Sequence, residues 1–124
     1  MIGLLKKPRV LLLDDDPSMQ RLIATLLRRE GLRVDVVSEA RQAIEKMGRF
    51  DYAVLLLDIM TPTEGGMTVI NHLRDDNPSL LKRVVLVTAS PASVLRMASK
   101  DVFAVVQKPF EAPELVATVR RLVA

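Results

Sequence analysis

The sequence predicts an α/β fold in which a parallel, five-stranded β-sheet is covered by helices on both faces. Short and nearly continuous apolar runs alternate along the chain with amphipathic segments of helical length. Strands that are buried on both faces have this continuous apolar composition, and parallel strands need helical crossovers between them. The length of 124 residues, with 49% hydrophobic and 27% charged residues, matches one globular domain. We therefore expect a single domain over residues 1–124.

Each predicted element has its own local signals. Asp16 is placed to cap a helix that has Pro17 at its first position and stops at Gly31. Ser38 can cap a second helix, which ends at Gly48. The predicted strands cover residues 10–13, 32–37, 53–57, 83–87 and 102–106, and the predicted helices cover residues 17–30, 39–47, 67–75, 91–98 and 111–123.

Right-handed crossovers between these strands lead to the sheet order 2-1-3-4-5 as the default. The expected fold is thus a flavodoxin-like, three-layer sandwich with five helices. No glycine-rich phosphate loop follows the first strand, so nucleotide binding is not expected.

Reactive side chains follow four of the predicted strands. Asp14 and Asp15 come after the first strand, Asp58 after the third, Thr88 after the fourth and Lys108 after the fifth. Ligands of open parallel sheets bind outside the carboxyl ends of the strands, so these side chains should meet at one edge. Carboxylates, a hydroxyl and an ammonium together predict a site for a metal ion and a phosphoryl group.

The remaining charges suggest a basic surface. If Asp14, Asp15, Asp16 and Asp58 gather in one site, 11 of the 15 acidic residues remain against 18 basic ones. Such a surface attracts acidic partners. The basic residues are scattered, with no run longer than two and few aromatic residues, so direct nucleic-acid binding is not expected. The chain lacks cysteine and a long apolar run, which favours a cytoplasmic protein that does not enter a membrane.

Four motifs, taken together and in this order, resemble the receiver domain of two-component response regulators over roughly residues 9 to 123. Each motif lies at the end of a predicted strand, which makes the combination specific although each motif alone is weak. The motifs are Leu11-Leu12-Leu13-Asp14-Asp15-Asp16-Pro17, Leu56-Leu57-Asp58-Ile59-Met60-Thr61-Pro62 followed by Gly66, Val87-Thr88-Ala89, and Lys108-Pro109-Phe110.

The resemblance implies a role for each site residue. Asp58 corresponds to the aspartate that accepts a phosphoryl group from a histidine kinase, and Asp14 and Asp15 correspond to the acidic pair that holds Mg²⁺. Thr88 and Lys108 correspond to the groups that engage the phosphoryl oxygens. The family also keeps the peptide bond that corresponds to Lys108-Pro109 in the cis form.

Mg²⁺ prefers hard oxygen ligands and retains several waters, so one or two carboxylates and a carbonyl suffice. We expect Asp15 and Asp58 as direct ligands, the Met60 carbonyl as a third, and Asp14 acting mainly through water. Asp16 is better explained as a helix cap than as a metal ligand.

Two departures from the family pattern bear on signalling. Most receivers have Tyr or Phe three residues before the lysine, but this chain has Val105, and we expect Phe103 to share a strand face with Val105 rather than replace the missing ring. Fast dephosphorylation in the family goes with polar groups two residues after the phosphoacceptor and two after the threonine. Met60 and Ser90 occupy these positions, which predicts slow decay.

The leading hypothesis is a phosphoacceptor switch that catalyses its own phosphorylation and is not a turnover enzyme. A pseudo-receiver that acts as a docking module is the alternative that Val105 suggests, whereas a hydrolase of the aspartyl-phosphate type would need a second carboxylate, as general acid, where Met60 stands. The expected partners are a histidine kinase or phosphotransfer protein and an output domain or downstream protein. The sequence leaves open the kinase, the input signal, the output, the oligomeric state, and whether the receiver stands alone or belongs to a longer regulator.

Overall fold

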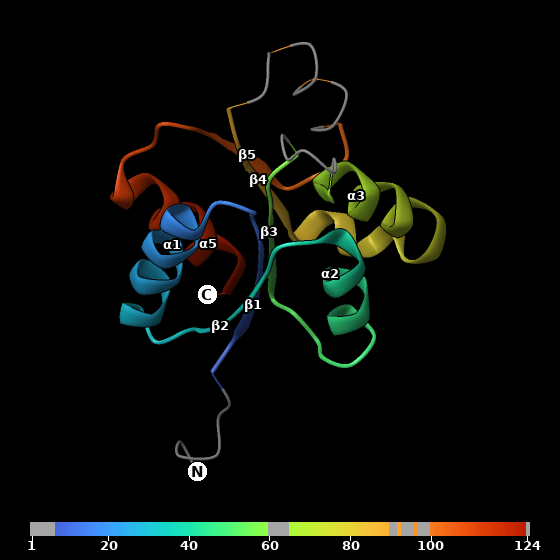
Figure 1. The fold of residues 1–124 in the computed structure, drawn as a ribbon, viewed down its shortest axis with the longest axis horizontal. Helices are drawn as coiled ribbons and strands as arrows, with labels where there is room; N and C mark the ends of the chain where they lie inside the picture. The colour runs from blue at the N-terminus through green and yellow to red at the C-terminus, as the bar shows by residue number, and fades with distance from the viewer. Residues whose placement is uncertain (1–6, 60–64, 90–91, 93–95, 97–99, 124) are drawn as a thin grey trace.

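The computed structural model describes residues 7–59, 65–89, 92, 96 and 100–123. Within them, five strands form one sheet of order β2-β1-β3-β4-β5, and every neighbouring pair is parallel (Figure 1). This confirms the predicted α/β fold and strand order. The strands are β1 (Arg9–Leu13), β2 (Arg33–Val37), β3 (Val54–Leu57), β4 (Val84–Thr88) and β5 (Ala104–Gln107).

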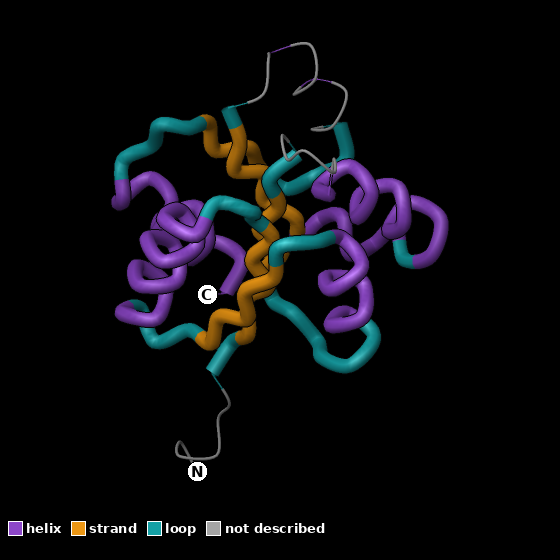
Figure 2. The backbone as a smooth tube through the Cα atoms, viewed as in Figure 1, coloured by secondary structure: helices purple, strands orange, loops and turns teal. Residues whose placement is uncertain are grey.

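Helices cover both faces of the sheet and complete the three layers (Figure 2). The helices α1 and α5 lie on one face, and α2 and α3 lie on the other (Figure 1). In the described part of the chain the helices are α1 (Pro17–Arg29), α2 (Ala40–Met47), α3 (Gly65–Asp76), the 3₁₀ helix η2 (Pro78–Arg83) and α5 (Ala112–Val123).

Successive strand residues point to opposite faces, so each strand contributes to two cores. In β1, Leu11 and Leu13 pack with α2 and α3, whereas Val10 and Leu12 pack with α1 and α5. All four side chains are at most 1% exposed. Burial on both faces explains why the central strands are continuously apolar rather than alternating.

The end signals of α1 agree with the sequence, whereas the starts of α2 and α3 differ, and α3 begins at Gly65, two residues before the predicted start. Asp16 caps α1, with its Oδ1 accepting a hydrogen bond of 2.9 Å from the Ser18 N–H, and Gly31 follows with a φ of 83°. The cap of α2 is Glu39, so the prediction of Ser38 was wrong by one residue. Gln42 Oε1 accepts from the backbone N–H groups of both Ser38 and Glu39, at 3.0 and 3.1 Å. This side chain satisfies the unpaired N–H groups in place of a serine hydroxyl.

Two further differences concern the chain around β4 and β5. The 3₁₀ helix η2 leads into β4, where we expected only a break after Asn77. The strand β5 starts at Ala104, two residues later than predicted, so Phe103 lies before the strand. Phe103 packs in the core of α1 and α5, whereas Val105 packs in that of α2 and α3. The prediction that Phe103 and Val105 share a face was therefore wrong.

The helix predicted at residues 91–98 falls largely outside the described residues. Among the residues that the structure describes, no helix is long and apolar enough to cross a membrane.

Candidate functional site

The four strands β1, β3, β4 and β5 are consecutive neighbours in the sheet, and each ends in a predicted site residue. Asp14 follows β1, Asp58 follows β3, Thr88 is the last residue of β4, and Lys108 follows β5. Backbone hydrogen bonds continue the ladder into the site: Asp58 N–H donates to the Leu13 carbonyl (3.1 Å) and Lys108 N–H to the Thr88 carbonyl (3.0 Å). The sheet register thus places these residues at one edge.

Lys108 joins the two buried carboxylates of the site. Its Nζ donates to Asp14 Oδ2 at 2.8 Å and to Asp58 Oδ2 at 3.0 Å. The Lys108 side chain is 16% exposed, and those of Asp14 and Asp58 are 2% and 8% exposed. Burial works to lower the pKa of Lys108, but the hydrogen bonds to Asp14 and Asp58 and their charges outweigh it and raise this pKa. The ammonium therefore stays charged and offsets the repulsion between the two carboxylates. The bond between Lys108 and Pro109 is cis.

Asp14 is held from several sides. Its Oδ1 accepts a hydrogen bond from the Asp16 N–H at 2.9 Å, and its backbone carbonyl accepts one from the Gln20 side-chain amide. The same amide donates to Ser38 Oγ at 3.0 Å and so connects the site to the start of α2. Gln20 is a positioning residue that the sequence did not reveal, because nothing in its local pattern distinguishes it from any polar residue on α1.

The remaining predicted metal ligands are less constrained. Asp15 is exposed at the end of β1, next to the buried Asp14. Asp16 is exposed and acts as the cap of α1, in agreement with the sequence. Met60, whose carbonyl we expected to bind Mg²⁺, lies outside the described residues.

Thr88 and Gly66 are two further described residues at this edge of the sheet. Thr88 is fully buried at the end of β4, the strand next to β3. The Gly66 N–H donates to the Asp58 carbonyl at 3.1 Å. A Cβ at Gly66 would lie 2.4 Å from that oxygen, which is closer than atoms can approach, so the first turn of α3 can only pack here as glycine.

The donor set fits Mg²⁺, although it is not a closed cage. Among the described residues, no group of three or more His, Asp or Glu side chains is arranged to hold a metal ion by itself. Asp14 and Asp58 nevertheless contact the same ammonium, with Asp15 at the same strand end. Mg²⁺ is typically held by one or two carboxylates, waters and phosphate oxygens. An open pair of hard oxygen ligands is therefore consistent with this ion.

The comparisons with known proteins agree with this geometry. The family model of the response regulator receiver domain matches residues 10–120. The transcriptional regulatory protein TcrA of Mycobacterium tuberculosis is 35% identical over 116 residues, which cover 92% of this chain and 45% of TcrA. The chain thus spans less than half the length of this relative.

Solved structures show the same fold. The response regulator TrrA of Thermotoga maritima, in complex with Mg²⁺ and a beryllium fluoride, has a TM-score of 0.81 and 28% identity, with 93% of this chain and 98% of that chain covered. A structure of the histidine kinase ThkA in complex with TrrA matches with a TM-score of 0.81 and 27% identity, covering 94% of this chain and 99% of that chain. The family match, the fold and the residues at the strand ends agree, and the chain belongs to the family of response regulator receiver domains.

Proposed function

We propose that residues 1–124 act as one phosphoacceptor domain in which Asp58 takes a phosphoryl group from a histidine kinase or phosphotransfer protein. The observation that carries the proposal is the Lys108 ammonium between Asp14 and Asp58, at the sheet edge where four strands end. A kinase partner is supported by the match to TrrA, which has been solved together with the histidine kinase ThkA.

In this reaction a carboxylate oxygen of Asp58 forms a bond to phosphorus while the bond from phosphorus to the donor nitrogen breaks, and the nitrogen keeps that electron pair. Asp15, Asp58 and the Met60 carbonyl would hold Mg²⁺, with Asp14 acting mainly through water. When bound, Mg²⁺ supplies positive charge that reduces the repulsion between the carboxylate and the phosphoryl group. Lys108 then donates to a phosphoryl oxygen in place of Asp58 Oδ2, and Thr88 donates its hydroxyl to another.

Phosphorylation of the purified chain tests the proposal. With acetyl phosphate and Mg²⁺, intact mass spectrometry should show one phosphoryl adduct, which a chelator and the Asp58→Asn variant should each abolish. Asp51→Asn is the matched control, because this exposed aspartate precedes the same strand at its other end and should leave the adduct unchanged. An adduct on Asp58→Asn, or none on the wild type, would refute the assignment. The second result would favour the docking module that lacks phosphoryl transfer.

The phosphorylated state should decay slowly, so that the domain works as a switch rather than as a turnover enzyme. Met60 stands two residues after Asp58, and its thioether cannot activate a water for attack on phosphorus. We expect Met60→Asn to shorten the half-life of the phosphoryl group, measured by loss of ³²P after removal of the donor. A half-life that is equal in wild type and Met60→Asn would show that Met60 does not limit hydrolysis.

The output would pass to another domain or to a separate downstream protein. TcrA is a transcriptional regulatory protein more than twice the length of the matched region, which supports an output domain as one route. Val105 has no aromatic ring and is half-buried against the core of α2 and α3. The conformational response should therefore depend on Thr88 and Lys108, and it should be small at β5, because a shift requires contacts that differ between the two states.

A further inference from the structure

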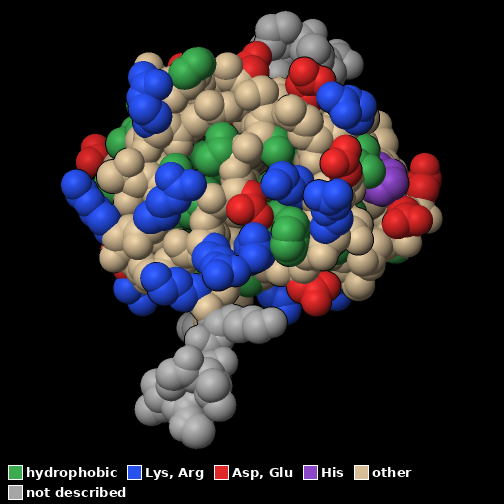
Figure 3. All heavy atoms as spheres, turned by 60° about the horizontal axis from the view of Figure 1, so that its bottom comes forward, with side chains coloured by type: hydrophobic (Ala, Val, Ile, Leu, Met, Phe, Trp, Pro, Cys, Tyr) green, Lys and Arg blue, Asp and Glu red, His purple; other side chains and the backbone are tan. Residues whose placement is uncertain are grey.

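A cleft lies at the end of the sheet where the strands begin, opposite the phosphoacceptor site. It has a volume of about 1360 Å³ and is lined by the starts of β1 and β2, the segments before β3 and β4, and the ends of α1 and α2. Figure 3 shows this end of the molecule with Lys and Arg side chains gathered across it. The cleft is separate from the phosphoacceptor site, which lies at the carboxyl ends of the same strands.

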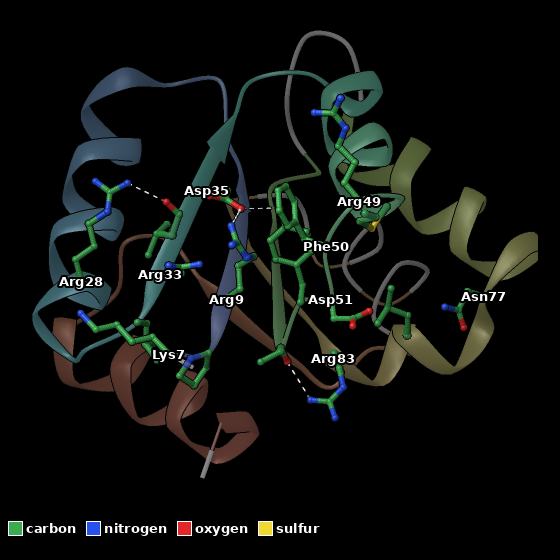
Figure 4. A pocket seen from close by; sticks show the side chains of 17 residues that line it. Lys7, Arg9, Arg28, Arg33, Asp35, Arg49, Phe50, Asp51, Asn77 and Arg83 are labelled. Atoms are coloured by element: carbon green, nitrogen blue, oxygen red, sulfur yellow. Dashed lines mark hydrogen bonds and ion pairs between the residues drawn. The ribbon is translucent and has the colours of Figure 1, made fainter. Parts of the chain in front are cut away.

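The cleft has a strong excess of positive charge. Its lining contains six basic residues against two acidic ones, Asp35 and Asp51, a formal excess of four charges. Among the described residues, Arg9 is the only one of the six that forms an ion pair, with Asp35 at 3.0 Å. The six are Lys7, Arg9, Arg28, Arg33, Arg49 and Arg83, which Figure 4 labels around the cavity.

Two of these guanidinium groups are held in place without being neutralised. Arg28 Nη2 donates to the Val34 carbonyl at 2.9 Å, and Arg83 Nη1 donates to the Ala53 carbonyl at 3.2 Å. A guanidinium has five N–H donors, so each keeps donors for a ligand. Because the backbone bond already restricts the side chain, less conformational entropy is lost when an anion binds.

Arg33 and Arg49 are exposed on two sides of the cavity and form no ion pair within the described part of the chain (Figure 4). Like charges gathered around one cavity repel each other and destabilise the fold. A ligand with several negative charges, spread over the length of the cleft, would remove this repulsion. A single small anion could not reach both sides.

The uncharged part of the lining indicates which polyanion fits. Pro8, Met47 and Leu80 are half-buried apolar residues of the cleft. They offer contacts to apolar side chains, which a nucleic-acid or polyphosphate backbone does not have. The exposed aromatic surface is also limited, because the Arg9 guanidinium lies 4.1 Å from the centre of the Phe50 ring, and base stacking needs a free ring. Residues 1–6, next to the cleft in sequence, contain no acidic residue that could fill it.

We propose that this cleft binds an acidic segment of a partner protein, whose carboxylates pair with Arg28, Arg33, Arg49 and Arg83 while its apolar side chains contact Met47 and Leu80. Arginine pairs with carboxylates through two parallel hydrogen bonds, which suits recognition of Asp and Glu side chains. The proposal does not depend on the phosphoryl chemistry at Asp58.

Binding of a labelled peptide that repeats Glu-Glu-Leu, followed by fluorescence anisotropy, tests the proposal on the full chain. Arg33→Gln combined with Arg49→Gln should weaken binding about five-fold, because two ion pairs are lost. The matched control is Arg21→Gln combined with Arg41→Gln, which removes two exposed charges outside the cleft and should have little effect. Neither double variant should melt below the wild type, which separates lost binding from lost folding; the cleft variant should melt slightly higher, because it removes repulsion between like charges.

Competitors identify the class of ligand. An all-Glu peptide of equal length should bind more weakly than the Glu-Glu-Leu peptide, and added salt should weaken both. Equal binding by the cleft variant and the control variant would overturn the site, as would no binding to the wild type. Tighter binding of tripolyphosphate or of a single-stranded oligonucleotide, or equal binding of the two peptides, would overturn the assignment to an acidic protein segment.

Discussion

Lys108 shows how much of the site depends on a single residue. Its ammonium contacts one oxygen each of Asp14 and Asp58, which are almost completely buried and would otherwise face each other as two negative charges. Removing one member of a buried ionic cluster lowers the free energy of unfolding far more than removing one member of an exposed ion pair. The reason is that the remaining buried charges lose their partner. The stability of the site should therefore respond sharply to this side chain.

Lys108→Met should lower the free energy of unfolding by about 3 kcal/mol at pH 7 in the presence of a chelator. The pKa of Lys108 is raised in the folded state, so its contribution is fully present below the ordinary lysine pKa of about 10.4 and is lost as the pH rises through the higher folded value. Urea unfolding from pH 7 to 11 checks this. The exposed Lys82→Met is the control and should change little. A difference that disappears between pH 7 and pH 9 would contradict the raised pKa.

Gly66 is a position at which only glycine fits the observed packing. A methyl group at this position would lie 2.4 Å from the carbonyl oxygen of Asp58 and 2.9 Å from the Cα of Ile59. We expect Gly66→Ala to destabilise the fold by about 1–3 kcal/mol through overpacking and to slow phosphorylation, because the backbone of Asp58 must move. Urea unfolding and the rate of adduct formation measure the two effects.

Gly48→Ala is the matched control, since its new methyl group would meet nothing closer than the Glu45 carbonyl at 3.4 Å. This variant should be neutral or slightly stabilising. Equal destabilisation by the two alanines would contradict the close approach to the Asp58 carbonyl as the cause of the effect at Gly66.

Among the structural elements, the first three strands are tied together at the end opposite the phosphoacceptor site. Asp35 in β2 accepts hydrogen bonds on one oxygen from Arg9 in β1 (3.0 Å) and from the Tyr52 hydroxyl before β3 (2.7 Å). Partial burial works to raise the pKa of Asp35, but these two hydrogen bonds and the charges of Arg9 and Lys46 outweigh it and lower this pKa. Burial and the neighbouring Asp35 raise the pKa of Tyr52, so its hydroxyl remains a donor at neutral pH.

Tyr52→Phe should therefore lower the free energy of unfolding by about 1 kcal/mol at pH 7. A lowered carboxyl pKa stabilises the fold above the ordinary value of about 3.9, and this contribution is lost as the pH falls through the folded value. The difference between the two proteins should then shrink in acid, and NMR titration should show a higher pKa for Asp35 in the variant. Asp51→Asn, one residue away and exposed, is the control. An unchanged pKa of Asp35 in Tyr52→Phe would contradict this account.

At the scale of the whole molecule, the parallel sheet separates two kinds of chemistry. All strands run in one direction, so acidic residues and Lys108 gather where the strands end, and arginines gather where the strands begin. The backbone hydrogen bonds of the sheet keep its two ends in fixed positions relative to each other. In the two functions proposed above, the phosphoryl group is taken up at one end and the acidic segment is contacted at the other, so the two do not compete for the same surface.

The sequence by itself determined the strand order and the edge at which Asp14, Asp58, Thr88 and Lys108 meet. The reason is that these features follow from local patterns: continuous apolar runs predict doubly buried strands, and parallel strands necessarily bring their carboxyl ends to one edge. The same local reasoning identified Asp16 as a cap and Gly31 as a helix end.

Only the tertiary structure decided which side chains meet across elements. The role of Gln20, the contact that restricts Gly66 and the face taken by Phe103 depend on distances between segments far apart in the chain. The basic cleft is the clearest case, because its residues come from separate segments between Lys7 and Arg83, and no run of basic residues in the sequence is longer than two. Scattered charges become a surface only when parallel strands start side by side, and that proximity is a property of the folded sheet rather than of any local pattern.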